Sequence, residues 1–236
     1  MANQRIRILS LILILLLLPV CIAAAEEEKV AESLLILVNK THPLPDTYMP
    51  EDLVEVNVTF AENVYPERKQ LRAPAAEALE KMFEGALADG IELIAVSGFR
   101  SYHTQAVIYE KRLEQAGQEY VDVYIAQPGC SEHQSGLAMD LGTQDSHDLT
   151  EAFADTEAYA WLSGHAAEYG FLVRYPKDGT ESTGYAYEPW HVRFVGEAAK
   201  EIAESGLTLE DWYDRRSVGT MKRYDLALDP LKKITD

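Results

Sequence analysis

The chain has 236 residues and is strongly acidic, with 39 Asp and Glu against 21 Lys and Arg and a formal net charge of −18 at pH 7. The phosphate backbone of nucleic acids repels a chain with this charge, so we expect no nucleic-acid partner. Its 47% of hydrophobic residues can build a core of ordinary size, and its two cysteines are too few for a disulfide-rich scaffold. We attribute the acidity to solubility.

The first 25 residues have the layout of a secretory signal peptide. Arg5 and Arg7 form a positive start, an uncharged apolar run follows over residues 8–18, and small residues lead up to Ala25. We expect cleavage after Ala25, which removes both arginines and changes the formal charge from −18 to −20. The protein would then be extracellular or associated with the cell envelope.

Two other fates of this segment also lead to export. The uncharged stretch 8–25 is at the short edge of what spans a bilayer, so it could remain as an uncleaved anchor, the one membrane contact that we expect. The sequence before Cys21 faintly resembles a lipoprotein cleavage box, although larger residues stand where small ones are preferred. Cleavage after Ala25 would leave Cys130 as the single cysteine, which excludes an internal disulfide.

The rest of the chain mixes helix and strand patterns without regular alternation. Apolar residues at helical spacing predict four helices, at 74–89, 102–117, 156–169 and 197–204. Short apolar or alternating runs predict strands at 91–96, 137–141, 171–175 and 185–195, with a hairpin-like connection at 179–184. This order favours an α+β domain with a small antiparallel sheet and flanking helices.

A stretch with the sequence C-S-E-H-Q-S-G-L-A-M-D-L, residues 130–141, carries His133 and Asp140. Gly136 and the apolar residues after it are typical of a turn entering a short buried strand, which would carry Asp140 into an apolar layer. Buried carboxylates are rare unless they are paired or bound to a metal. For His133 and Asp140 taken alone, an exposed histidine and a turn or helix-capping aspartate remain the alternative.

A second stretch, Y-E-P-W-H-V-R at residues 187–193, supplies a third candidate ligand. The alternation of apolar residues around His191 places that histidine on a strand face. Pro189 cannot donate to a strand ladder, so it favours Glu188 at the entrance of the strand. Two imidazoles and one carboxylate are typical of a catalytic zinc that keeps an open position for water, whereas closed structural sites usually use thiolates. His103 is the most plausible rival ligand.

A third stretch, S-G-F-R-S at residues 97–101, lies between a predicted strand and a predicted helix. Such a junction presents side chains and backbone N–H groups at an edge where a ligand can bind. Arg100 is the candidate substrate contact there, and Gln105 lies one turn into the helix. From these residues alone, an ion pair of Arg100 with an acidic surface is the favoured interpretation.

These three stretches resemble, in sequence, order and spacing, the signatures of the VanY-type D-alanyl-D-alanine carboxypeptidases, zinc peptidases of the M15 class. The similarity runs from about residue 38 to about residue 196, which is most of the mature chain. It implies the Hedgehog/D-Ala-D-Ala peptidase fold, in agreement with the α+β prediction. One departure is Cys130, where many relatives carry another residue, and we assign it no ligand role.

The resemblance implies a role for each candidate residue. It implies one zinc ion per chain bound by His133, Asp140 and His191. It implies Glu188 as the catalytic base and Arg100 as the residue facing the substrate carbonyl or carboxylate. From their positions, Ser131 and Gln105 are candidate hydrogen-bonding partners of the peptide, and they complete the predicted site.

The expected reaction is removal of the C-terminal D-Ala from peptidoglycan stem peptides. An L,D-carboxypeptidase or a cross-link endopeptidase would share every metal residue. A serine route is excluded because no serine has a lysine three residues on. A zinc-stabilised binding module is the alternative of another class, and Glu188 with Arg100 argues against it, since a structural metal uses neither a base nor an oxyanion partner.

Around this site we expect four parts of a monomeric protein. They are a signal peptide over 1–25, an acidic tether over 26–37, the zinc peptidase domain over 38–205 and a C-terminal extension over 206–236 packed on that domain.

Overall fold

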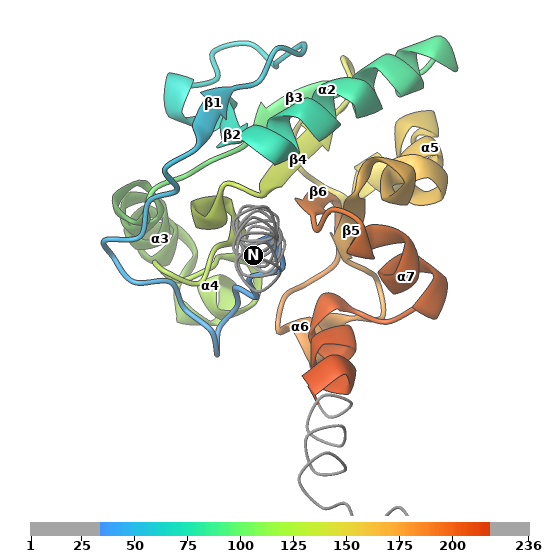
Figure 1. Cartoon of the computed structure of the whole chain (residues 1–236). Helices are drawn as coiled ribbons and strands as arrows, with labels where there is room; N and C mark the ends of the chain where they lie inside the picture. The colour runs from blue at the N-terminus through green and yellow to red at the C-terminus, as the bar shows by residue number, and fades with distance from the viewer. Residues whose placement is uncertain (1–33, 218–236) are drawn as a thin grey trace, which may run out of the picture. The chain divides into compact units, whose positions relative to one another are not determined.

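The computed structural model describes residues 34–217, and the elements named below lie in the unit that begins at Leu37 (Figure 1). Its strands are β1 (Leu53–Glu55), β2 (Gln70–Arg72), β3 (Ile94–Ser97), β4 (Ala138–Gly142), β5 (Phe171–Tyr175) and β6 (Glu188–Phe194). Its α-helices are α2 (Ala73–Ala88), α3 (Tyr102–Ala116), α4 (Gln118–Tyr124), α5 (Glu157–His165), α6 (Thr180–Thr183) and α7 (Ala198–Ser205). Four 3-10 helices join them, η1 (Pro66–Lys69), η2 (Glu132–Ser135), η3 (Glu151–Asp155) and η4 (Ala166–Tyr169).

The strands form two antiparallel sheets, which confirms the predicted α+β class. One sheet pairs β1 with β2, and the other has four strands in the order β3–β4–β6–β5. The helices predicted from apolar periodicity are present. The helix expected over 156–169 is divided into α5 and the 3-10 helix η4, and η4 ends at Gly170, which has a φ of 83°. The prediction of a hairpin-like connection at 179–184 is wrong, because Thr180–Thr183 forms the short helix α6.

Helix α2 shows how local sequence and packing agree. Pro74 lies in its first turn, where its missing N–H leaves no hydrogen bond unmade. Leu79 and Met82 are fully buried on one face, and burying each side chain contributes about 1.5–3 kcal/mol. The helix packs against β1, β2 and η4. At its C-terminal end, Trp161 Nε1 of α5 donates to a carboxylate oxygen of Asp89 over 2.8 Å, which joins the two helices.

The register of the four-stranded sheet separates an apolar face from a polar face. Met139 of β4 pairs with Val192 of β6, and both side chains are fully buried. The next pair along, Asp140 with His191, lies on the opposite face because successive residues of a strand alternate between faces. Ser97 of β3 pairs with Asp140, so three neighbouring strands bring polar side chains to one face. Strand β4 is therefore buried on both faces, and only one face is hydrophobic.

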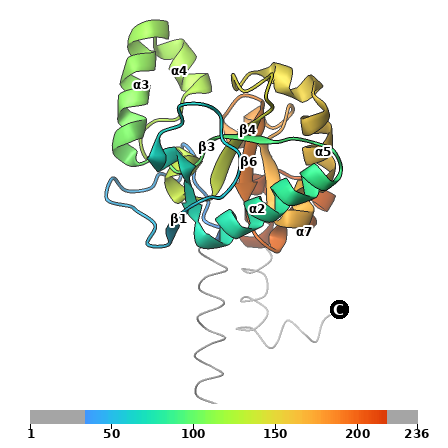
Figure 2. The same cartoon turned by 90° about the horizontal axis from the view of Figure 1, so that it is seen from above.

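Helices surround the sheet on opposite sides, with α3 and α4 on one side and α5 and α7 on the other (Figures 1 and 2). Helices α3 and α4 pack against each other, and α7 packs against β5 and η4. In the part of the chain that the structure describes, no helix has both the length and the apolar character needed to cross a bilayer. The predicted signal peptide and most of the predicted acidic tether fall outside the described residues.

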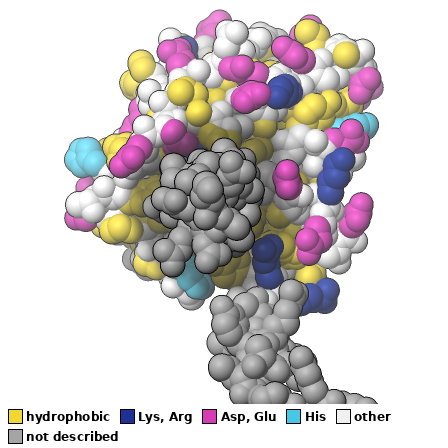
Figure 3. Space-filling model, viewed as in Figure 1, with side chains coloured by type: hydrophobic (Ala, Val, Ile, Leu, Met, Phe, Trp, Pro, Cys, Tyr) yellow, Lys and Arg dark blue, Asp and Glu magenta, His cyan; other side chains and the backbone are white. Residues whose placement is uncertain are grey.

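The segment after α7 packs by its hydrophobic side chains. Residues 209–217 are helical, and Leu209 and Trp212 are buried at 1% and 3% exposure. Trp212 Nε1 donates to a carboxylate oxygen of Glu201 on α7 over 3.0 Å. On the molecular face drawn in Figure 3, acidic side chains are spread over the surface and outnumber the basic ones, as the net charge requires.

Candidate metal centre

Three side chains from separate parts of the sequence meet on the polar face of the sheet. They are His133, Asp140 and His191, and one ligand atom of each lies within 4.8 Å of the others. His133 Nε2 is 3.2 Å from Asp140 Oδ2, and His191 Nδ1 is 3.1 Å from Asp140 Oδ1. All three side chains are buried, with residue exposures of 3–4%. The structure thus brings the three predicted ligands together.

The turn between His133 and Asp140 depends on Gly136. This residue ends η2 in the left-handed conformation at φ 70°, which glycine adopts without the steric penalty of a side chain. A Cβ atom there would lie 3.0 Å from Arg72 Cγ and 3.0 Å from Leu53 Cδ2, so a side chain would also crowd the β1–β2 sheet. The chain can therefore leave η2 and enter β4 directly, with His133 and Asp140 on the same side.

Hydrogen bonds on the outer side of each imidazole determine which nitrogen faces the cluster. His133 Nδ1 lies 2.8 Å from the carbonyl oxygen of Gly98, so Nδ1 carries a proton and Nε2 faces Asp140. His191 Nε2 lies 3.3 Å from Glu132 Oε2, so Nδ1 of this ring faces Asp140. Metal-binding histidines have this arrangement, in which the outer nitrogen donates to a carbonyl or a carboxylate.

The donor set fits a divalent cation. Asp140 Oδ1 is buried and lies 3.1 Å from His191 Nδ1, but this contact does not have hydrogen-bond geometry, so a carboxylate lone pair remains directed into the cluster. Burial acts to raise the pKa of Asp140, but His133 and His191 hold it well below the usual value, so the carboxylate is ionised. Burial lowers the pKa of His133, which favours the neutral imidazole that a metal requires.

The electrostatics at His191 also favour positive charge at the centre of the cluster. Burial alone would lower the pKa of this histidine, but its contacts with the carboxylates of Asp140 and Glu132 raise it to about 9. Without a metal, the His191 imidazole therefore carries an extra proton next to these carboxylates. A divalent cation satisfies the same field with a larger charge.

Glu188 lies beside the three candidate ligands. It is the first residue of β6, as Pro189 led us to expect, and its Oε2 is 3.6 Å from His191 Nδ1. Burial raises the pKa of Glu188 to about 7, and the negative charge of Asp140 adds to the increase. A carboxylate with a pKa near neutrality both accepts and releases a proton readily at physiological pH.

Arg100, Ser131 and Gln105 line the same cleft. Arg100 Nη2 donates to Ser131 Oγ over 3.2 Å, and its Nε is buried without a hydrogen-bond partner within residues 34–217. No ion pair of Arg100 is found in that part of the chain, so the alternative of an acidic surface partner has no support. Gln105 Nε2 donates to the carbonyl oxygen of Ala126 over 2.6 Å, while its Oε1 is buried and unpartnered in the same range.

The cleft has a volume of about 820 Å³ and extends from the cluster to α3 and α4. Its outer wall carries Lys111 and Arg112 of α3 and the aromatic pair Tyr120 and Tyr124, whose ring centroids are 4.8 Å apart. This is the size of a pocket that encloses a short peptide or a comparable small molecule.

The remaining histidines stay outside the cluster. His103, the predicted rival ligand, is exposed in the first turn of α3. His42 and His147 are also exposed, and each bonds within its own loop, to Asn39 and to Thr143. His165 is half-buried, stacks on Trp161 and bonds to its carbonyl oxygen over 2.9 Å, which makes it a packing residue.

Four charged residues directly behind the cluster were not predicted from the sequence. Glu132, Arg174 and Arg193 are buried at 2% exposure or less, and Glu210 is buried at 8%. The sequence does contain a signal: both arginines interrupt apolar strand patterns, F-L-V-R-Y and W-H-V-R-F. A charge at a buried strand position requires a partner.

A buried cluster of two histidines and an aspartate, beside a carboxylate with raised pKa in an open cleft, is the arrangement of a metal-dependent hydrolase. The family model for VanY, described as D-alanyl-D-alanine carboxypeptidase, matches residues 68–197. The D-alanyl-D-alanine carboxypeptidase of Enterococcus faecalis is 35% identical over 199 residues, which cover 80% of this chain and 69% of that protein. The chain therefore belongs to the VanY family of D-alanyl-D-alanine carboxypeptidases, a family of hydrolases, as its motifs indicated.

Two solved structures extend the comparison to the fold. The LD-carboxypeptidase LdcB is 44% identical, with a TM-score of 0.74 over 78% of this chain and 87% of that one. A mutant of the vancomycin-resistance D,D-pentapeptidase VanY, in complex with Zn(II), is 33% identical, with a TM-score of 0.61 over 77% of this chain and 99% of that one. These similarities confirm the predicted D-Ala-D-Ala peptidase fold.

Proposed function

We propose that the protein is a zinc-dependent carboxypeptidase that releases the C-terminal D-alanine of peptidoglycan stem peptides. The observation that carries this proposal is the convergence of His133, Asp140 and His191, with Glu188 3.6 Å from the nearest imidazole nitrogen. When bound there, zinc supplies Lewis-acid chemistry that polarises a carbonyl group and makes water acidic enough to act as a nucleophile near neutral pH. The Zn(II) complex of a relative supports this choice of metal.

Glu188 moves the proton. Its pKa of about 7 lets the ionised carboxylate accept a proton from the attacking water and then deliver it to the leaving amine. Its position at the start of β6, next to His191, gives it access to the same point in the cleft as the three candidate ligands. Glu188 thus acts first as a base and then as an acid.

Arg100 provides fixed positive charge in the cleft. Its guanidinium group could stabilise the oxyanion that develops at the scissile carbonyl, or hold the terminal carboxylate of the substrate. Ser131 orients one end of this group through the 3.2 Å hydrogen bond to Nη2. The unpartnered Nε of Arg100 and Oε1 of Gln105 are further polar atoms that a bound peptide could satisfy.

The first candidate substrate is a stem peptide that ends in D-Ala-D-Ala, the bond that gives the family its name. A second candidate is a stem peptide with a single terminal D-Ala attached to an L-centre. The observation that favours it is the higher identity to the LD-carboxypeptidase LdcB, 44%, than to the D,D-pentapeptidase VanY, 33%.

One experiment tests both the metal and the substrate. The purified protein is analysed for metal content and then assayed for D-alanine release, with and without a chelator, from peptides ending in D-Ala-D-Ala, in a single D-Ala or in a cross-bridge. We expect one zinc ion per chain and chelator-sensitive release from one of the first two peptides. Release that persists in the metal-free protein would contradict the proposal, and release from the cross-bridge alone would assign an endopeptidase.

We also propose that the protein is exported by its N-terminal segment and that the catalytic domain covers residues 38–205. Recognition of peptidoglycan by a relative, the LD-carboxypeptidase LdcB, agrees with an envelope location. Fractionation of cells that express the full chain, with N-terminal sequencing of the product, tests cleavage after Ala25. A product that begins at Met1 and stays with the membrane would instead assign an anchor.

A further inference from the structure

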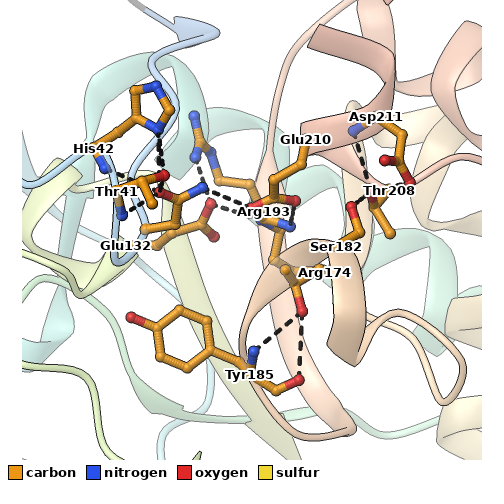
Figure 4. Close-up of polar contacts among 12 residues, drawn as sticks. Thr41, His42, Glu132, Arg174, Ser182, Tyr185, Arg193, Thr208, Glu210 and Asp211 are labelled. Carbon is orange, nitrogen blue, oxygen red and sulfur yellow. Dashed lines mark hydrogen bonds and ion pairs between the residues drawn. The ribbon is translucent and has the colours of Figure 1, made fainter. Parts of the chain in front are cut away.

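A fully buried carboxylate lies directly behind the candidate metal ligands. Glu132 Oε2 is 3.3 Å from His191 Nε2, the ring nitrogen that faces away from the cluster. The other oxygen, Oε1, accepts hydrogen bonds from Arg174 Nε over 2.7 Å and from Arg193 Nη1 over 2.8 Å. Figure 4 shows these charged groups packed together between the strands and the C-terminal segment. One oxygen of Glu132 is thus held by the arginines, and the other is left for the histidine.

The arginines are fixed in turn by residues distant in sequence. Arg174 donates from Nη1 and Nη2 to the two carboxylate oxygens of Glu210, over 2.8 and 2.6 Å, in a bidentate pair. Glu210 Oε1 also accepts from Asn39 Nδ2 over 3.1 Å. Asn39 and Glu210 both lie outside residues 68–197, the range that the family model matches. The chain of contacts therefore connects both flanks of the domain to His191.

The geometry leaves Glu132 little freedom to move. Its side chain has no solvent exposure, and the side chains of Arg174 and Arg193 are equally inaccessible. A carboxylate held this way fixes both the tautomer and the orientation of the imidazole to which it bonds, because a rotated ring would lose this hydrogen bond at a site that is inaccessible to bulk solvent. His191 Nδ1 is consequently directed toward Asp140 and the cleft.

We propose that Glu132 is the positioning residue of the metal centre, holding His191 by Nε2 so that Nδ1 is presented to the ion. The pairing of Arg174 with Glu210 supports Glu132 from behind, so the C-terminal segment at 209–212 contributes to the site although it touches no substrate. This inference rests on the proposed function, since it concerns the same zinc site.

The test measures metal affinity rather than turnover. Zinc binding is determined by competition with a chelating dye for the wild-type protein and for Glu132→Gln, and the visible spectrum of the cobalt-substituted protein reports the ligand geometry. We expect Glu132→Gln to weaken zinc affinity by about 10- to 100-fold and to shift the cobalt spectrum, the size of effect seen when such outer partners of metal-binding histidines are removed.

Two further variants separate positioning from general loss of stability. Glu132→Asp keeps a negative charge for both arginines but retracts the carboxylate by one methylene. We expect this variant to fold and to lose about 3- to 10-fold in zinc affinity. Asp52→Asn breaks a partly buried ion pair with Arg72, of 2.9 Å, outside the site, and should leave zinc affinity and the cobalt spectrum unchanged.

The outcomes distinguish this inference from the proposed function. Zinc affinities of Glu132→Gln and Glu132→Asp within about twofold of the wild type, with an unchanged cobalt spectrum, would overturn the positioning role and leave the proposed function intact. An equal loss in Asp52→Asn would also overturn it, because the effect would then follow stability. If Glu132→Gln does not fold, the comparison of Glu132→Asp with Asp52→Asn decides. A wild-type protein that binds no zinc would refute the proposed function itself.

Discussion

Two clusters of buried charge lie side by side in this protein, and they differ in how completely their charges are paired. In the supporting cluster behind the candidate metal ligands, Glu132 contacts two arginines and a histidine, and both oxygens of Glu210 are bonded to Arg174. In the candidate metal centre and its cleft, Arg100 Nε and Gln105 Oε1 are buried without a hydrogen-bond partner among residues 34–217, and Asp140 Oδ1 has only the 3.1 Å contact with His191 Nδ1, which lacks hydrogen-bond geometry. The first cluster is complete without a ligand, and the second is not.

The difference shows how buried charge can be assigned a role. A buried charge that is fully paired costs desolvation energy but holds its neighbours in one arrangement. A buried polar atom left unpaired costs about 1–3 kcal/mol, which is recovered when a ligand arrives. We therefore interpret the paired cluster as support for the site and the unpaired one as the site of chemistry. The variants below test this division, from the largest expected effect to the smallest.

Substitution of Glu188 tests the chemical cluster. We expect Glu188→Gln to lower kcat by about 10²- to 10⁴-fold, because the amide cannot accept the proton of the attacking water. Zinc content should stay near the wild-type level, since Glu188 is not one of the three candidate ligands. Steady-state hydrolysis and metal analysis on the same preparation measure both quantities. An unchanged rate would refute the assignment of Glu188.

Substitution of Arg174 tests the supporting cluster. We expect Arg174→Met to lower the free energy of unfolding by about 3–5 kcal/mol, because Glu132 and Glu210 would remain buried and charged without this partner. Denaturant unfolding measures the change. The matched control is Arg215→Met on the exposed side of the C-terminal helix, which should leave stability unchanged. Equal effects at the two positions would remove the distinction between paired support and surface charge.

The pH dependence of the free energy of unfolding tests the raised pKa of Glu188 beside the metal centre. Burial raises the pKa of Glu188 from 4.5 to about 7, so the metal-free folded protein keeps this proton to a higher pH than the unfolded chain. The contribution of Glu188 to stability is thus fully present below pH 4.5 and is lost as the pH rises through 7.

A variant without the Glu188 carboxyl group should not lose stability as the pH rises through 7. We expect metal-free Glu188→Gln to be about 1–3 kcal/mol more stable than the metal-free wild type at pH 8, with a smaller difference at pH 5. Denaturant unfolding of both proteins in the presence of a chelator at the two pH values provides the measurement. A variant less stable than the wild type at pH 8 would contradict the raised pKa of Glu188.

The smallest expected effect concerns Ser131. Replacing it with alanine removes the hydrogen bond to Arg100 Nη2, worth about 0.5–1.5 kcal/mol, and leaves the arginine less well oriented for the substrate. We expect Ser131→Ala to raise KM by about 2- to 10-fold with little change in kcat. A large fall in kcat at constant KM would instead place Ser131 in the chemical step.

The two clusters differ in how far their residues can be predicted from the sequence. The residues of the chemical cluster occur in short motifs, so His133, Asp140, His191 and Glu188 could be identified from residue type and spacing, and the structure brings them together. Helix α2 was predictable for a related reason: the 3.6-residue repeat of its buried positions is recorded in the order of the residues.

The supporting cluster could not be predicted in this way. Arg174 and Glu132 are 42 residues apart and Arg174 and Glu210 are 36 apart, and no local pattern indicates that they meet. Similarly, the polar segment around Thr180 was expected to be a connection, but Ser182 and Thr208 bond through their hydroxyl groups over 2.7 Å and hold the short helix α6 against the C-terminal segment.

By itself, the sequence determined the family, the mixed helix and sheet architecture, and the candidate residues for metal binding and proton transfer. These depend on residue types at fixed local spacing. Only the tertiary structure decided which imidazole nitrogen faces the centre, which buried charges are paired and which remain open to a ligand. The reason is physical: pairing of charges across a folded core depends on distances between strands and helices that the order of the residues does not encode locally.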